Sequence, residues 1–358
     1  IMLPAIDSAA ASDSRALPMQ FEAWTEGPAQ NCGSRCRTFV SAVGAITADT
    51  PREFQAFAKN QKLEGMTIAL DSDGGSVLGA LALVGAACDC SDGRRLAIVT
   101  GGGPGAMEAA NRGAFDVGWI ERLHGAVERD IADPGPNATN FAEGSTAGTF
   151  FGDMFMWRRD ADFRAAALAS PAASIAAALM RSERADFFYD QLFVKEPGTA
   201  HPTPWHQDQP YWPVKGWQIA SVWIALDRVD RSNGAVEFVA GSHRWGVNFR
   251  PTPFRKGHEV KFTSSDLAII PDIDADRGRY DIRRWDMEAG DCLVFHAMIV
   301  HGAPGNLTSG TRRRGLALRY TGDDVRYDPR PGTFQFPHRP DLAAGAPMEC
   351  ELFPKAFP

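Results

Sequence analysis

The sequence predicts a mainly β fold, a sandwich or barrel, with helices at its side and a partial α/β segment before it. From Phe187 to about Tyr320, apolar and aromatic runs of four to eight residues alternate with turns rich in glycine, proline and asparagine, a spacing typical of a sandwich or barrel. Before this region, residues 117–131 carry an apolar stripe at helical spacing. Residues 161–182 predict two further helices, broken at Pro171. Residues 38–87 alternate between strand and helix patterns.

Composition limits the classes of partner. The chain has 358 residues, of which 44% are hydrophobic and 10% aromatic, enough for a substantial core. Its net charge of -7 argues against nucleic acid or an anionic membrane as partner. No apolar run approaches the length of a membrane span. We therefore expect a cytoplasmic protein that acts on a small molecule, and no pattern indicates its oligomeric state.

The stretch around His206-Gln207-Asp208 carries the strongest chemical signal. In an extended strand, residues i and i+2 point to the same face, so this imidazole and this carboxylate can reach one ion. Two histidines and one carboxylate around a metal with open positions form the ligand set of non-haem Fe(II) oxygenases. The sequence therefore predicts two ligands of a metal site here and requires a third from elsewhere.

The third ligand is predicted in G-D-C-L-V-F-H-A-M-I-V-H-G, which offers His296 and His301. This apolar run reads as one buried strand that ends at Gly302. Because the two histidines are five residues apart, they would face opposite sides of such a strand. We expect His301 to complete the site, because it lies at the strand end, where functional residues gather.

An arginine run follows the predicted metal ligands. After a polar turn, a new apolar strand opens with Arg312, Arg313 and Arg314. A planar guanidinium in a pocket binds a carboxylate through two parallel hydrogen bonds, which a lysine cannot reproduce. An iron enzyme with an acidic co-substrate needs such a group.

Residues from about 115 to 358 resemble the phytanoyl-CoA dioxygenase family of Fe(II)- and 2-oxoglutarate-dependent oxygenases. The resemblance rests on five motifs in this order: W-H-Q-D at 205–208, S-V-W-I-A-L-D at 221–227, N-G-A-V-E-F-V-A-G-S-H-R at 233–244, G-D-C-L-V-F-H at 290–296 and H-G-A-P-G-N at 301–306. It implies a double-stranded β-helix, or jelly roll, with helices packed on one side. It also implies Fe(II), 2-oxoglutarate and O2 as the reacting partners, with succinate and carbon dioxide as products beside a hydroxylated small molecule.

Carried over residue by residue, the resemblance places the family's iron ligands on His206, Asp208 and His301. The arginine that anchors the far carboxylate of 2-oxoglutarate falls on Arg312 by its distance from the last ligand. It falls on Arg313 by its place in the following strand, so both stay open.

Other side chains around the predicted centre are candidates for binding. Gln191 and Lys195 share one face of the strand before the metal-binding stretch and are candidate contacts to 2-oxoglutarate; the alternative for Lys195 is a solvated strand edge. Trp205, Tyr211 and Trp212 would crowd the mouth of the site. These rings either form a wall of the substrate site or pack against one another to cover the end of the barrel.

The N-terminal part, residues 1–114, does not resemble an oxygenase sequence. We expect it to form a partial α/β segment distinct from the dioxygenase domain at 115–358. Residues of about 30–87 resemble part of a Clp-protease-like periplasmic protein, where Ser76 in a glycine turn is more simply a helix cap than a nucleophile. Residues of about 95–114 are similar to the glycine loop of lysine-decarboxylase-like nucleotide-binding proteins. Both fragments lack the rest of their own sites.

Two alternatives to the oxygenase belong to other classes. One is a catalytically idle jelly roll that serves as a binding module, which iron-dependent release of succinate would exclude. The other is a nucleotide-binding or hydrolytic role for the N-terminal part, favoured only if a nucleotide raises the melting temperature.

Overall fold

The computed structural model of the chain consists of two compact units, Ile1–Arg112 and Gly113–Pro358. The structure describes residues 17–25, 38–47, 49–59, 67–71, 97–100, 114–143, 148–254, 267–334, 336 and 340–357.

The first unit contains a four-stranded sheet in the order β1-β2-β3-β4. Its strands are β1 (Gln20–Thr25), β2 (Thr38–Val43), β3 (Thr67–Asp71) and β4 (Ala97–Thr100). β1 pairs antiparallel with β2, and the other pairs are parallel. Helix α3 (Thr50–Ala58) buries Phe54, whose ring meets that of Phe21 on β1 at 5.2 Å. The first strand, helix and strand predicted for residues 38–87 are observed, whereas the second predicted helix, Ser76 and the predicted glycine loop at 101–106 lie outside the described residues.

The second unit is built on a seven-stranded antiparallel sheet. The strand order is β13-β10-β15-β7-β6-β5, and β17 also pairs with β7. The strands are β13 (Cys292–His296), β10 (Ile219–Ala225), β15 (Arg313–Thr321), β7 (Ala185–Lys195), β6 (Phe150–Met154), β5 (Thr139–Asn140) and β17 (Lys355–Phe357). The central strands β10, β15 and β7 are almost wholly buried. Such strands need cover on both faces.

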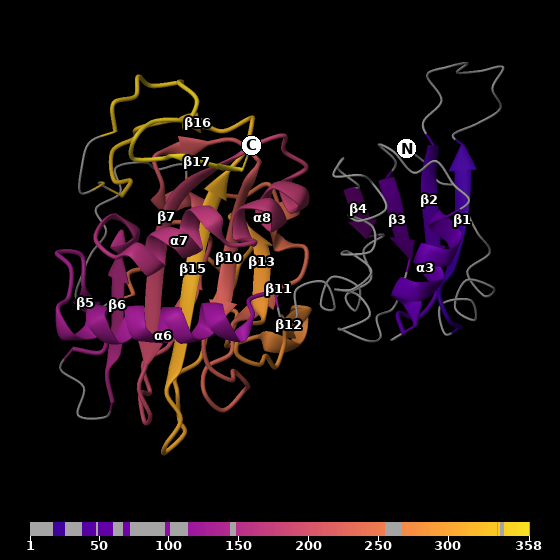
Figure 1. Ribbon diagram of the computed structural model, residues 1–358. Helices are drawn as coiled ribbons and strands as arrows, with labels where there is room; N and C mark the ends of the chain where they lie inside the picture. The colour runs from indigo at the N-terminus through magenta and orange to yellow at the C-terminus, as the bar shows by residue number, and fades with distance from the viewer. Residues whose placement is uncertain are drawn as a thin grey trace. The chain divides into compact units, whose positions relative to one another are not determined.

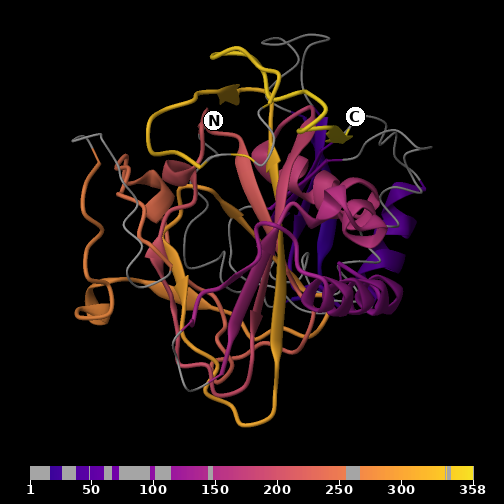
Figure 2. The ribbon, with the colours of Figure 1, turned by 90° about the vertical axis from the view of Figure 1, so that its left-hand side faces the viewer.

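Helices cover one face of this sheet, as Figures 1 and 2 show. They are α6 (Val117–Ala132), α7 (Ala161–Ala169) and α8 (Ala172–Met180), and the break between the last two falls at Pro171 as predicted. The apolar stripe of α6 packs through Leu123 and Val127 into one core cluster with sheet residues such as Leu316 and Leu318. None of the helices in the described residues combines the length and the apolar character that a membrane span requires.

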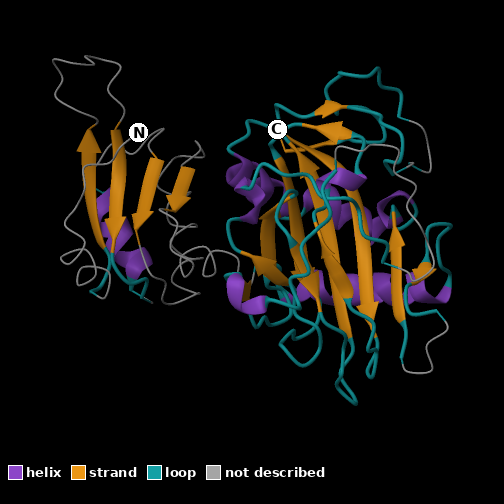
Figure 3. Ribbon diagram, turned by 180° about the vertical axis from the view of Figure 1, so that it is seen from behind, coloured by secondary structure: helices purple, strands orange, loops and turns teal. Residues whose placement is uncertain are grey.

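A smaller sheet lies on the other face of the large sheet (Figure 2). Its order is β12-β11-β14-β8, from strands β12 (Ile282–Arg284), β11 (Glu237–Val239), β14 (His301–Ala303) and β8 (Thr203–His206). A second apolar cluster joins the two sheets through Phe193 and Trp223 on the large sheet and Phe238 on the small one. A short pair, β9 (Val214–Lys215) with β16 (Arg326–Tyr327), lies beside them (Figure 3). The predicted jelly roll with helices on one side is confirmed.

Two local predictions were wrong. The apolar run at 292–303 is not one strand: it turns after His296, and β13 and β14 belong to different sheets. The parity argument for His301 therefore rested on a false premise. β8 also ends at His206, and Asp208 has helical dihedral angles at the start of a 3-10 turn. The two side chains meet because the chain turns, and not because they alternate along a strand.

Gly315 on β15 is a sensitive point of this packing. A Cβ atom there would overlap the indole ring of Trp223 on the neighbouring strand. Gly315→Ala should therefore lower the free energy of unfolding by about 1–3 kcal/mol, the usual effect of overpacking a core. Chemical denaturation measures this, with Gly310→Ala as control because its Cβ meets nothing within 4 Å. Equal stability of the two variants would contradict the packing described.

Candidate functional site

His206, Asp208 and His301 lie together between the two sheets. One ligand atom from each lies within 4.8 Å of the others, and all three residues are buried. His206 and His301 are direct partners in the antiparallel pairing of β8 with β14, which sets their rings 4.2 Å apart. The nearest Asp208 oxygen is 3.4 Å from Nε2 of His206 and 4.0 Å from Nε2 of His301. Two nitrogens and one oxygen thus converge on one point.

Backbone carbonyls fix the orientation of both imidazoles. Nδ1 of His206 lies 2.8 Å from the Pro204 oxygen, and Nδ1 of His301 lies 3.1 Å from the Ile299 oxygen. A neutral ring that donates through Nδ1 presents the lone pair of Nε2, which is the form that binds metals. Burial, followed by the charge of His206, lowers the pKa of His301 to about 3. That ring is therefore neutral at physiological pH.

Asp208 is held in its ionised form. Its Oδ2 accepts a hydrogen bond from Ser221 Oγ at 3.1 Å and lies 3.7 Å from Nε of Arg319. Burial alone would raise the pKa of Asp208, but the charge of Arg319 and the contacts with His206 and His301 outweigh it. The pKa stays well below the usual range. The site therefore offers a carboxylate and two imidazoles, which is the donor set that suits Fe(II).

Gln207 fastens the metal-binding turn to its surroundings. Its buried side chain donates to the backbone oxygens of Val247 and Met298, each at 3.0 Å, and accepts from the Phe249 N–H at 3.0 Å. It faces away from the two ligands on either side of it. The amide therefore ties three chain segments together next to the site.

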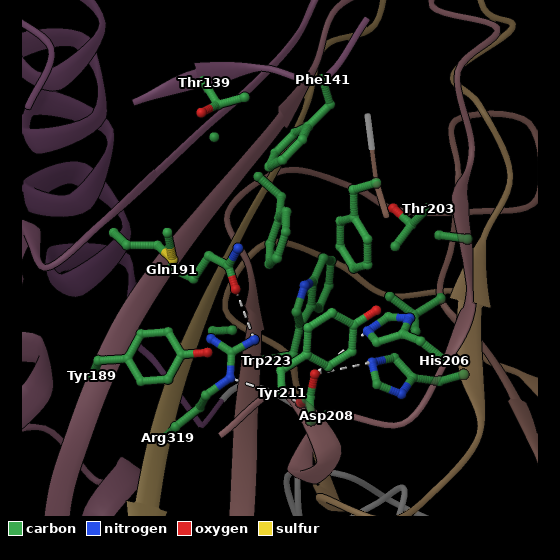
Figure 4. Close-up of a pocket in the computed structure, with 18 of the residues that line it drawn as sticks. Thr139, Phe141, Tyr189, Gln191, Thr203, His206, Asp208, Tyr211, Trp223 and Arg319 are labelled. Carbon is green, nitrogen blue, oxygen red and sulfur yellow. Dashed lines mark hydrogen bonds and ion pairs between the residues drawn. The ribbon is translucent and has the colours of Figure 1, made fainter. Parts of the chain in front are cut away.

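A cavity of about 360 Å³ opens in front of the three side chains (Figure 4). Aromatic and aliphatic groups from both sheets and the neighbouring loops make most of its wall. They include Phe141, Met154, Tyr189, Phe193, Tyr211, Trp212, Trp223, Val236, Phe254, Phe295 and Phe334. The polar lining includes Asn137, Gln191, Arg313 and Arg319. A few polar groups in an apolar pocket are typical of a small-molecule site.

The structure separates the two candidate arginines. Arg313 lines the cavity, is 2% exposed, and donates to the Gly234 oxygen at 3.0 Å. Burial lowers the pKa of its guanidinium to about 10. Arg312 is not among the residues that line the cavity, and its guanidinium binds the carboxylates of Glu196 and Glu128, each at 2.7 Å. Neighbouring residues of a strand face opposite sides, so only one of them reaches the interior.

Lys195 is fully buried and does not occupy a solvated strand edge. Its Nζ donates to the backbone oxygens of Pro304 at 2.7 Å and Ala303 at 3.3 Å, and does not line the cavity. Burial, followed by the charge of Arg313, holds the pKa of this amine well below its usual value. Lys195 thus lies behind Arg313 and braces the loop after β14.

Among the other predicted contacts, some side chains line the cavity and some do not. Gln191, Tyr211 and Trp212 line the cavity, whereas Trp205 does not and packs under the guanidinium of Arg277 at 5.9 Å. His296 is also outside the cavity, with Nε2 2.6 Å from the Trp217 oxygen.

Sequence reasoning missed Arg319, Trp223 and Phe254. Arg319 could have been found by alternation, because it shares a face of β15 with Arg313, whereas Trp223 lies in the quoted motif at 221–227 without a role of its own. Phe254 follows a long loop, and its ring meets that of His206 at 4.7 Å. No pattern in the sequence marks that approach.

Comparison with known proteins decides the family. The sequence model described as phytanoyl-CoA dioxygenase (PhyH) matches residues 109–315, more than half of the chain. The chain belongs to the phytanoyl-CoA dioxygenase family.

Curated relatives agree over a shorter stretch. The chain is 29% identical over 151 residues to the peroxisomal phytanoyl-CoA dioxygenase of Rattus norvegicus, covering 41% of this chain and 42% of the relative. It is 31% identical over 134 residues to a probable phytanoyl-CoA dioxygenase of Caenorhabditis elegans, covering 37% of this chain and 40% of the relative. The match thus spans about two-fifths of the length of these relatives.

Among solved structures, the chain resembles the non-haem α-ketoglutarate-dependent carbocyclase SnoK from nogalamycin biosynthesis. That match has a TM-score of 0.54 and 24% identity, and covers 68% of this chain and 89% of the other. The epimerase SnoN from the same pathway matches with a TM-score of 0.52 and 23% identity, covering 68% and 91%. These similarities support the fold described above.

Gln207 offers a test of how the site is supported. Gln207→Met keeps the volume but leaves the carbonyls of Val247 and Met298 and the N–H of Phe249 without their partner. Each buried polar group that loses a partner costs about 1–3 kcal/mol, so we expect a drop in unfolding free energy of at least about 2 kcal/mol. Thermal unfolding with and without Fe(II) measures it. A variant as stable as the wild type would show that this amide does not hold the turn.

Proposed function

We propose that the chain is an Fe(II)- and 2-oxoglutarate-dependent dioxygenase that hydroxylates a C–H bond of a small organic substrate. The observation that carries the proposal is the buried convergence of His206, Asp208 and His301 at the wall of an apolar cavity. Membership of the phytanoyl-CoA dioxygenase family supports it.

The residues present fit an iron ion. Two imidazole nitrogens and one carboxylate oxygen would hold three positions and leave the others for 2-oxoglutarate and O2. When bound, Fe(II) supplies the activation of O2 and the oxidative decarboxylation of 2-oxoglutarate to succinate and carbon dioxide, coupled to hydroxylation of the substrate. The protein's part is to fix the ligands, orient both organic molecules and exclude water.

Arg313 is the proposed anchor of the distal carboxylate of 2-oxoglutarate. It is a buried cation on the cavity wall, its Nε has no hydrogen-bond partner, and Lys195 is its direct partner on the neighbouring strand β7. A bidentate guanidinium would fix the co-substrate along the wall beside Trp223, whose ring lies 5.6 Å from the Arg313 guanidinium. Its other end would then face the metal ligands.

The rest of the lining suits a substrate with a substantial apolar part. Rings of Phe141, Phe193 and Phe254 border the cavity, and they would exclude water from the reacting groups. The cytoplasmic location expected from the sequence stays a prediction, and several relatives are named as peroxisomal enzymes.

The ligand proposal predicts loss of activity on removal of any one of the three. His206→Ala, Asp208→Ala and His301→Ala should each reduce Fe(II)-dependent succinate formation by more than about a hundredfold, because the metal loses the geometry on which its open positions depend. Succinate is measured at saturating Fe(II) and 2-oxoglutarate. His296→Ala is the control, because this histidine lies outside the cavity. Activity retained in His301→Ala and lost in His296→Ala would refute the assignment.

The co-substrate proposal separates adjacent arginines. Arg313→Lys should raise the KM for 2-oxoglutarate about tenfold or more, because a bidentate pair becomes a single contact. Arg312→Lys should change this KM less than about twofold, since that guanidinium is bound to Glu196 and Glu128. Iron affinity should stay the same in both. The reverse order of effects would assign the anchor to Arg312.

We further propose that the chemistry belongs to the second unit. The residues assigned to the metal and the co-substrate lie after residue 190, and the whole cavity lining lies within residues 137–334, so a chain that begins at Gly113 should decarboxylate 2-oxoglutarate within about threefold of the full-length rate. Rates are compared at matched iron occupancy. If the shortened protein folds but loses more than about tenfold in rate, equal to about 1.4 kcal/mol in barrier, residues 1–112 are part of the enzyme.

A further inference from the structure

Arg319 is a second arginine in the same cavity, and the proposed reaction gives it no role so far. It is 4% exposed and lines the cavity from β15. The ring of Tyr189 lies 4.6 Å from its guanidinium and the ring of Trp212 lies 5.4 Å from it. Figure 4 shows the guanidinium between Tyr189 and Asp208, with Gln191 above it.

The hydrogen bonds of Arg319 are incomplete. Nη2 donates to Gln191 Oε1 at 2.9 Å, but Nε and Nη1 are buried without a hydrogen-bond partner. The nearest carboxylate is Asp208, at 3.7 Å from Nε, too far for a hydrogen bond. A buried charge whose donors are unpaired is costly, so such a group normally has a partner. Here the partner must come from the cavity.

Asp208 does not supply that partner once the proposed complex has formed. Two positive charges on Fe(II) and one on Arg313 are balanced by Asp208 and by the two carboxylates of 2-oxoglutarate. Lys195 adds no negative charge, and burial and the charge of Arg313 lower the pKa of its amine. The other acid in the lining, Asp153, accepts hydrogen bonds from Arg159 and the Gly135 N–H. Arg319 therefore carries one positive charge that nothing in the complex neutralises.

The co-substrate does not reach both arginines at once. Arg313 pairs with Lys195 across β7, whereas Arg319 pairs with Tyr189. Their α-carbons are six residues apart on one strand, about 20 Å at about 3.3 Å per residue. Arg319 also pairs with Ser221, which holds Asp208, and so lies level with the metal ligands. A short diacid anchored at Arg313 with its other end at the metal leaves Arg319 for another molecule.

We infer that Arg319 binds a carboxylate of the substrate, so that the enzyme acts on an organic acid with an apolar, aromatic-sized body. This inference rests on the proposed function and names the class of its substrate. The guanidinium would hold the carboxylate next to the iron ligands, with Gln191 fixing the orientation of the guanidinium. The apolar body would lie against the rings of Phe141, Phe193 and Phe254. The bond to be hydroxylated would then lie a few atoms from the carboxylate.

The test measures binding and not turnover. Anaerobic protein loaded with Fe(II) and 2-oxoglutarate is titrated calorimetrically with three acids and with the amide of each: 3-phenylpropanoate, indole-3-propanoate and octanoate. At least one acid should bind about tenfold or more tightly than its amide, because a charge-assisted bidentate pair replaces a neutral contact. In Arg319→Gln this preference should fall below about twofold. The affinity for 2-oxoglutarate, titrated separately in the same variant, should stay within about threefold of wild type.

Two further variants control the measurement. Arg228→Gln removes one positive charge at an exposed position, with its side chain 67% exposed, and should keep the wild-type preference for the acid. Arg319→Lys keeps the charge without the planar pair of donors and should show an intermediate preference. If circular dichroism shows that Arg319→Gln does not fold, the preference for the acid measured in Arg319→Lys tests the inference in its place.

Several outcomes would overturn the inference. One is that no acid binds more tightly than its amide in the wild type, which includes failure of every acid to bind. A second is a preference for the acid that survives in Arg319→Gln. A third is a tenfold loss of 2-oxoglutarate affinity in Arg319→Gln, which would assign Arg319 to the co-substrate. Failure of the wild-type protein to bind Fe(II) and 2-oxoglutarate would instead refute the proposed function, so the two failures are distinguishable.

Discussion

The pairing of β8 with β14 is the constraint on which the candidate site depends. It sets His206 directly opposite His301 across two antiparallel strands, where side chains on one face come within contact distance. The turn after β8 then brings Asp208 back toward both rings. Because the small sheet faces the large one, the three ligands open into the space between the sheets. Any change that shifts this register would separate the ligands.

Buried charge is the second theme of the structure. The cavity wall holds Asp208, Arg313 and Arg319, all at most 5% exposed. The two arginines are only partly satisfied within the protein: Nε of both and Nη1 of Arg319 have no hydrogen-bond partner. A core built for stability alone would not keep such groups, because apolar residues of similar volume are usually at least as stable. Their unpaired donors are best explained by charged partners that bind in the cavity.

Sequence reasoning predicted the fold class because its signals are local. Helix periodicity in residues 117–131, the break at Pro171 and the short apolar runs after Phe187 each depend on near neighbours, and each corresponds to an observed element. The motif H-Q-D also pointed to the ligand pair, although the geometry assumed for it was wrong. Asp208 lies in a turn, so the strand alternation used to join it to His206 does not exist.

The sequence by itself determined the family, the fold class and which residue types could bind a metal. The tertiary structure decided which side chains meet, because that depends on how the strands pair and how the two sheets pack. It separated Arg313 from Arg312, because Arg313, the first residue of β15, lines the cavity, whereas Arg312 just before the strand is bound to Glu128 and Glu196. It brought Lys195 behind Arg313, moved Trp205 out of the cavity, and placed Arg319 beside Asp208. These contacts join residues that are far apart in the chain. Strand register and the packing of the two sheets bring them together, and no local sequence pattern encodes either.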